Sequence, residues 1–209
     1  MSTTSIAVRA ATVTHAHDAP PFARATARLL DLNNLSDEGA ARLAEFRGVV
    51  ALKSQSDPQK ATIRCDDSGV RVEHGADSDA DVVMVVDVTT PGVPLSADPD
   101  DALAAAATTL LNPELPEWTE LAAAFWGLVR NLPAMPSLRI VELGTEREVL
   151  LDGGDGTYEI HGAAGALQAL LAGTEFFADA VYAGRLLIKG TFSQFSVVAG
   201  ASMKVMWDV

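Results

Sequence analysis

Histidine, cysteine and acidic side chains are the groups of this 209-residue chain that could do chemistry, and they are thinly spread. His15 and His17 could place two imidazoles on one metal ion, but only Asp18 stands beside them, in a segment with the composition of a tail. Cys65 alternates with apolar residues in a strand-like run, which indicates a buried and inert thiol. His161 ends another strand-like run, and we interpret it as a structural histidine.

The motifs of several enzyme classes are missing from the sequence. It contains neither the G-x-S-x-G of a serine hydrolase, nor a phosphate-binding G-x-x-x-x-G-K-S/T, nor the H-E-x-x-H of a zinc protease. The glycine-rich residues 153–156 stand between two strand-like runs, where a turn explains them. The single cysteine excludes an intrachain disulfide framework. No known catalytic motif is therefore found.

The charge balance limits the partners of the chain. Its 15 basic and 28 acidic residues give a net charge of −13, which disfavours nucleic acids and anionic membranes. Residues 65–101 are the most acidic region, with ten acids and one base, and we interpret them as solvated strand ends and turns. No apolar run is long enough to cross a membrane and the N-terminus has no signal-peptide pattern, so a cytoplasmic location without stable membrane insertion is expected.

The first half of the chain predicts two helices and then a sheet. A flexible tail with room for one short strand is expected over residues 1–21, a helix over 22–32, and a second helix that Ser36 caps. Four strands within residues 49–86 predict an antiparallel meander, whose last strand, 82–86, is continuously apolar and is expected to be covered on both faces. A helix then follows from Asp98, the expected cap, to Leu111.

The second half alternates helices and short strands. A helix from Pro116 to Leu132 carries one broad apolar stripe. Strands are expected at 138–143, 148–151, 157–161 and 186–188, with two short helices between the last two strands. A further short helix around Phe192 is expected to end near Gly200, before a strand or extended tail over 203–207. The fold class is therefore α+β, a largely antiparallel sheet covered by short amphipathic helices.

The C-terminal part resembles the sterol carrier protein type-two family. The resemblance rests on a strand, Thr157-Tyr158-Glu159-Ile160; a helix that ends in Leu170-Leu171-Ala172-Gly173; and the run Tyr182-Ala183-Gly184-Arg185-Leu186-Leu187-Ile188-Lys189-Gly190. Residues 49–86 match the family in outline only. The resemblance implies one sterol-carrier-like domain over residues 22–209, with an inserted helical pair at about 89–137 that departs from the family; a tandem or duplicated domain is the alternative.

The resemblance implies non-catalytic binding or carriage of a lipid-like ligand (a sterol, fatty acid or fatty acyl-CoA) in an apolar tunnel between the sheet and its helices. It also implies no catalytic group, no bound metal and no cofactor. The lining expected for this tunnel consists of apolar side chains from the inserted helix, the short helices after it and the closing segment: Phe125, Leu128, Val129, Leu132, Phe176, Phe177, Phe192, Phe195, Met203, Met206 and Trp207. The generous apolar surface is compatible with a homodimer, and a partner enzyme of lipid metabolism is the other protein partner considered.

Two other functions are compatible with the same sequence. A cofactor-independent isomerase, cyclase or hydrolase would need a titratable group in an apolar cavity, and His161 is the best candidate for its acid or base. An interaction module would instead use the acidic region, with Asp77, Asp79 and Asp81 as contacts for a partner.

Overall fold

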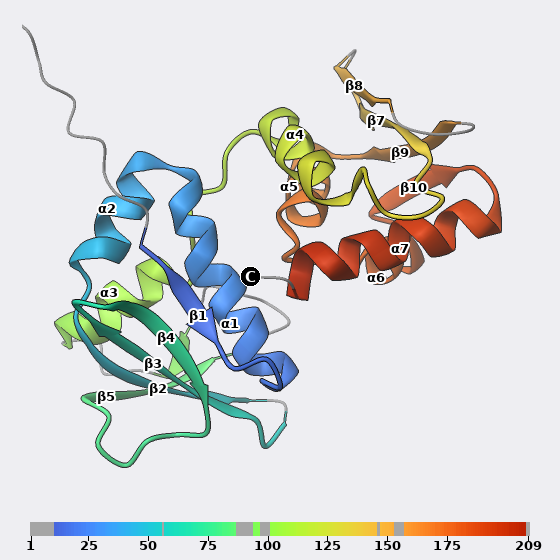
Figure 1. The fold of residues 1–209 in the computed structure, drawn as a ribbon. Coiled ribbons are helices and arrows are strands. Elements are labelled where there is room, and N and C mark those ends of the chain that lie inside the picture. The colour runs from blue at the N-terminus through green and yellow to red at the C-terminus, as the bar shows by residue number, and fades with distance from the viewer. Residues whose placement is uncertain are drawn as a thin grey trace, which may run out of the picture. The chain divides into compact units, whose positions relative to one another are not determined.

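The chain forms two compact units, each with its own β-sheet (Figure 1). The computed structural model describes residues 11–55, 57–86, 94–96, 101–145, 147–152 and 157–207. We call residues 1–115 unit 1 and residues 116–208 unit 2. Both combine a sheet with helices, so the chain has a mixed α+β fold as predicted. Residues 89–137, expected to be an insert in a single domain, contribute one helix to each unit.

Unit 1 has a six-stranded sheet with the order β1-β4-β3-β2-β5-β6. Its apolar side chains pack between this sheet and the helices in one core. In chain order its elements are β1 (Val13–His15), α1 (Pro21–Asp31), the short 3-10 helix η1 (Leu32–Leu35), α2 (Asp37–Glu45), β2 (Gly48–Ser54), β3 (Lys60–Asp66), β4 (Gly69–His74), β5 (Val82–Val86), β6 (Pro94–Ser96) and α3 (Ala102–Leu110).

Residues 11–20, expected to belong to a flexible tail with room for one short strand, are part of the packed structure of unit 1. β1 pairs in parallel with β4, and Val13 and Ala19 are buried. Arg24 of α1 donates a hydrogen bond from Nε to the Ala19 carbonyl oxygen at 2.8 Å. These residues adopt a defined structure because Val13 is apolar and because β4 offers a free edge for pairing.

β5 departs from the predicted meander. β2, β3 and β4 pair antiparallel as expected, but β5 pairs in parallel with the opposite edge of β2. Its apolar run is also covered on one face only: Val82 and Met84 are buried, whereas Val83 is 47% exposed. Exposed β-branched residues suit a strand, so an apolar run alone does not identify a strand that is buried on both faces.

The two predicted helix caps of unit 1 have different outcomes. Ser36 caps α2, because its Oγ accepts a hydrogen bond from the Gly39 N–H at 3.1 Å. α3 is capped by Asp101, whose carboxylate accepts from the N–H groups of Leu103 and Ala104. The prediction of Asp98 as the cap was wrong, since α3 begins at Ala102; Asp98 itself lies outside the described residues.

Unit 2 has a four-stranded sheet with the order β10-β9-β7-β8. β7 pairs antiparallel with β8 and in parallel with β9, and β9 pairs antiparallel with β10. In chain order its elements are α4 (Trp118–Val129), β7 (Ser137–Glu142), β8 (Glu148–Leu151), β9 (Thr157–Gly162), α5 (Ala164–Ala172), α6 (Phe177–Tyr182), β10 (Leu186–Lys189) and α7 (Phe192–Trp207).

The sheet of unit 2 has one covered and one open face. The alternate residues Leu138, Ile140, Tyr158, Ile160 and Leu186 are buried, and we call their side the covered face. The residues between them form the open face, which carries charged side chains and two exposed leucines, Leu150 and Leu187.

α7 is longer than the sequence suggested. It runs from Phe192 to Trp207 without interruption, so the prediction of a helix end near Gly200 followed by a strand or tail was wrong. A β-carbon at Gly200 would meet nothing within 4 Å, which places this glycine in open space. A glycine in the interior of a helix costs only about 1 kcal/mol relative to alanine, and the apolar contacts of a 16-residue helix outweigh that cost.

The two units share one strand pattern. In unit 1, β2 has an antiparallel partner, β3, on one side and a parallel partner, β5, on the other, and β5 then pairs with β6. In unit 2, β7, β8, β9 and β10 repeat this arrangement. A helix directly precedes and another follows the strand set in each unit. The duplicated domain considered from the sequence stays a prediction.

Gly173 follows α5 and lies close to the backbone of α7, so a substitution at this position tests the packing of α5 on α7. It has φ +71°, and with Thr174 it closes the helix through hydrogen bonds to the Leu170 and Ala169 carbonyl oxygens. A β-carbon there would lie 3.1–3.2 Å from the backbone of α7 at Met206. Gly173→Ala should therefore lower the free energy of unfolding by about 2 kcal/mol, half from left-handed strain and half from crowding.

Gly184 is the matched control. It also has φ +71° after a helix, but a β-carbon there would meet nothing within 4 Å. Gly184→Ala should cost only the conformational part, about 1 kcal/mol. Denaturant unfolding of both variants measures the difference, and equal losses would show that α7 does not press on Gly173.

Candidate functional site

Four aromatic rings of unit 2 are in contact in series. Phe192 stacks on Phe195 with 6.0 Å between centroids, Phe195 meets Phe177 at 5.4 Å, and Phe177 meets the edge of Tyr158 at 6.4 Å. Phe192 is 83% exposed, whereas Phe177 and Tyr158 are 1% and 0% exposed. We call these four residues the ring series. It leads from the surface of unit 2 to its core.

The start of α7 positions the outer two rings. Thr191 and Gln194 form a capping box: the Thr191 N–H donates to Gln194 Oε1 at 2.9 Å, and the Gln194 N–H donates to Thr191 Oγ1 at 3.2 Å. The cap fixes Phe192 in the first turn of the helix. Phe195 follows three residues later, so both rings lie on one side of α7.

Gly190 positions the inner ring. A β-carbon at this glycine would lie 2.2 Å from Cδ2 and 2.7 Å from Cε2 of Tyr158, so the ring lies directly against the backbone of residue 190. Only glycine permits this approach. Gly190 was recognised in the sequence as the end of a strand, but its contact with Tyr158 joins two segments that are far apart in sequence.

Tyr158 is the residue of this site that sequence reasoning missed. Its hydroxyl is buried and has no hydrogen-bond partner among the described residues. Burial raises the pKa of the hydroxyl to about 12, so the phenol stays neutral at physiological pH. The signal was present in the alternation of β9, which puts Tyr158 and Ile160 on the same face.

All the residues predicted to line a tunnel lie in unit 2, but they differ in exposure. Beyond the ring series, Phe176 contacts Trp207 at 5.7 Å between centroids. Four of the predicted residues are buried (Phe125, Val129, Phe177 and Met206), three are half-buried (Leu132, Phe195 and Trp207), and four are exposed (Leu128, Phe176, Phe192 and Met203).

His161 lies on the open face, on the opposite side of β9 from Tyr158. Its Nε2 is 3.1 Å from Glu159 Oε2, and Glu159 also accepts a hydrogen bond from Lys189 Nζ at 3.1 Å. Both hydrogen bonds lower the pKa of Glu159, and the one from Lys189 makes the larger contribution. The acid or base considered for an enzyme is therefore outside the layer between the sheet and its helices.

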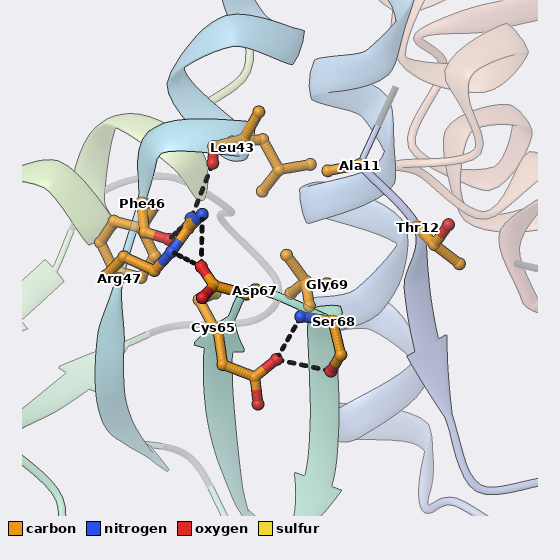
Figure 2. A pocket seen from close by; sticks show the side chains of 12 residues that line it. Ala11, Thr12, Leu43, Phe46, Arg47, Cys65, Asp67, Ser68 and Gly69 are labelled. Atoms are coloured by element: carbon orange, nitrogen blue, oxygen red, sulfur yellow. Dashed lines mark hydrogen bonds and ion pairs between the residues drawn. The ribbon is translucent and has the colours of Figure 1, made fainter. Parts of the chain in front are cut away.

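Unit 1 contains a hollow of about 340 Å³ beside the turn between β3 and β4 (Figure 2). Leu43, Phe46 and Cys65 provide apolar lining, while Arg47 spans the hollow to Asp67 at 3.3 Å. None of the residues predicted to line a tunnel contributes to this hollow.

Cys65 is buried, as predicted, and burial raises the pKa of its thiol to about 12. At pH 8 the native protein should therefore react with iodoacetamide about a thousandfold more slowly than the unfolded chain, because a raised pKa leaves only a small fraction of the thiol ionised. The rate should rise with pH up to about 12. Mass spectrometry reads this signal directly, since the chain has one cysteine. Rapid labelling of the folded protein would contradict the burial of this thiol.

Two of the three acids proposed for an interaction module, Asp77 and Asp81, have structural roles. Asp77 pairs with Arg64 and accepts a hydrogen bond from the Asp79 N–H at 2.9 Å. Asp81 accepts a hydrogen bond from the Val49 N–H at 2.8 Å. Neutralising Asp77 or Asp81 would disturb unit 1 itself, so partner loss in such variants would not isolate a docking contact.

Comparisons with known proteins give one weak likeness. No family model matches the chain, and no curated protein matches it. Among solved structures it is similar to a conserved hypothetical protein of Thermus thermophilus that is described as possibly a sterol carrier protein, with 13% identity, a TM-score of 0.22, and coverage of 95% of this chain and 93% of that one. That score is too low to assign a function. Within the described residues, no helix has the length and apolar character needed to cross a bilayer.

Proposed function

We propose that unit 2 binds or carries a lipid-like molecule, a sterol, fatty acid or fatty acyl-CoA, between the covered face of its sheet and helices α6 and α7. The observation that carries this proposal is the ring series, which joins an almost fully exposed phenylalanine to a fully buried tyrosine. Aromatic side chains give an apolar ligand a large contact area. The ligand enters by displacing the outer rings.

The distribution of exposed apolar side chains also supports unit 2 as the ligand-binding part of the chain. Of the ten large apolar residues that are exposed in the described part of the chain, eight belong to unit 2. Burying about 300 Å² of apolar surface on a ligand would contribute roughly 7 kcal/mol before the cost of ordering. These eight residues are Leu128, Leu143, Leu150, Phe176, Tyr182, Leu187, Phe192 and Met203.

The binding proposal is favoured over the enzyme because of the position of His161, the acid or base considered for catalysis. His161 is hydrogen-bonded to Glu159 on the open face, and the apolar residues that would hold a substrate are on the covered face. A general acid or base must be within hydrogen-bond reach of the reacting atoms. A carrier needs no such group.

Truncation of Phe192 tests the proposal. Phe192→Ala should weaken binding of a neutral apolar fluorophore such as Nile red about five- to tenfold, because the outermost ring of the series is lost. Its melting temperature should hardly change, since the side chain is 83% exposed. Fluorescence titration and thermal unfolding of the full chain measure both quantities.

Leu150→Ala is the matched control for that experiment. Leu150 is 64% exposed but lies on the open face, where it pairs in register with Arg139. Its truncation removes exposed apolar surface without touching the ring series, so probe affinity should stay as in the unmodified chain. Equal losses in both variants would mean that the probe adheres to exposed apolar side chains in general, and the proposed site would be refuted.

A further inference from the structure

The inner end of the ring series presents a polar group that no described residue of unit 2 uses. The Tyr158 hydroxyl is fully buried on the covered face and has no partner among the described residues. A buried hydroxyl without a hydrogen bond is destabilising, and native proteins rarely keep one. A bound molecule that reaches along the ring series would meet this hydroxyl last.

The surroundings of Tyr158 determine which polar groups of a ligand could form a hydrogen bond with its hydroxyl. Burial alone raises the pKa of this hydroxyl to about 12, with no contribution from a neighbouring charge. The phenol is therefore a neutral hydrogen-bond donor. An ionised carboxylate would lose its hydration there without gaining a counter-charge, which is strongly unfavourable. A neutral oxygen, such as that of an alcohol or a ketone, accepts a hydrogen bond at much lower cost.

We infer that the ligand of unit 2 is a neutral amphiphile with one oxygen-bearing head, and that it binds head-first, with the oxygen accepting a hydrogen bond from Tyr158 and the apolar body lying along Phe177, Phe195 and Phe192. This inference rests on the proposed function, because it assumes that an apolar ligand enters between the covered face and the helices. It goes further by fixing the orientation of the ligand and by separating neutral from anionic lipids.

Three matched probes test the inference on the full chain at pH 7: a pyrene-labelled alkane, the alkanol and the alkanoic acid of equal chain length. The unmodified protein should bind the alkanol about five- to tenfold more tightly than the alkane, and the alkanoate more weakly than the alkanol. Tyr158→Phe should bind the alkane with unchanged affinity and lose the preference for the alkanol.

The outcomes separate this inference from the proposed function. If none of the probes binds, the proposed function fails and the inference with it. If alkane and alkanol bind equally, or if Tyr158→Phe keeps the preference, the ligand site stands and the role of Tyr158 is refuted. Tightest binding of the alkanoate would overturn the neutral head.

A stability measurement on Tyr158→Phe gives an independent check. Because the hydroxyl has no partner among the described residues, its removal should leave the melting temperature of the ligand-free chain unchanged or raise it. A clear fall would reveal that the hydroxyl already satisfies a group of the protein, and that result would overturn the assignment of Tyr158 to a ligand. Tyr182→Phe, which alters the other, 84% exposed tyrosine, is the control.

Discussion

Gly190→Ala is expected to destabilise unit 2 by about 3 kcal/mol or more. The new β-carbon would lie 2.2 Å from the Tyr158 ring, a distance that real β-carbons essentially never show. The ring is rigid and also contacts Phe177, so β9, β10 or α6 must shift. Denaturant unfolding gives the loss in free energy, and hydrogen exchange of β9 and β10 places it in unit 2.

Gly200→Ala is the control for Gly190→Ala. It adds the same methyl group in unit 2, but inside α7, where nothing lies within 4 Å. Since alanine favours a helix over glycine, this variant should gain about 0.5–1 kcal/mol. A Gly190→Ala variant as stable as the unmodified chain would contradict the packing of Tyr158 on β10.

Phe177→Ala should have the second large effect, a loss of about 3–5 kcal/mol in the free energy of unfolding. The side chain is 1% exposed and is in contact with the rings of both Tyr158 and Phe195, so its removal leaves a cavity. Phe177→Leu should cost less because it fills part of that volume. Urea unfolding followed by tryptophan fluorescence measures both variants.

Phe192→Ala is the control for Phe177→Ala. The two phenylalanines belong to one ring series, yet Phe192 is 83% exposed and its truncation should cost less than about 0.5 kcal/mol. Similar losses for the two variants would show that the gradient from surface to core along the series is absent.

Local signals in the sequence were sufficient where one element determines its own boundaries. Ser36 marks the start of α2, and Gly173 and Gly184 mark the ends of α5 and α6, because caps depend on residues within one turn. Strands were likewise predicted over the ranges of β4 and β9.

Features that depend on distant partners were not predictable in the same way. β5 has an apolar sequence that fits several positions in a sheet, and its parallel pairing with β2 depends on which edge is free. Gly200 has the residue type of a helix end, but the packing of α7 on α4, α5 and α6 carries the helix past it. The contact between Gly190 and Tyr158 is of the same kind, because β9 and β10 meet only after α5 and α6 have folded back.

Hydrogen exchange of the full chain with and without a saturated C16 alcohol tests the central claim, that unit 2 holds an apolar ligand between its covered face and its last helices. The account predicts slower exchange in α6, β9 and the first turns of α7, with the Phe192→Ala variant showing less protection at the same alcohol concentration. Unchanged exchange throughout unit 2, or protection confined to the hollow of unit 1 around Leu43, Phe46 and Cys65, would contradict it.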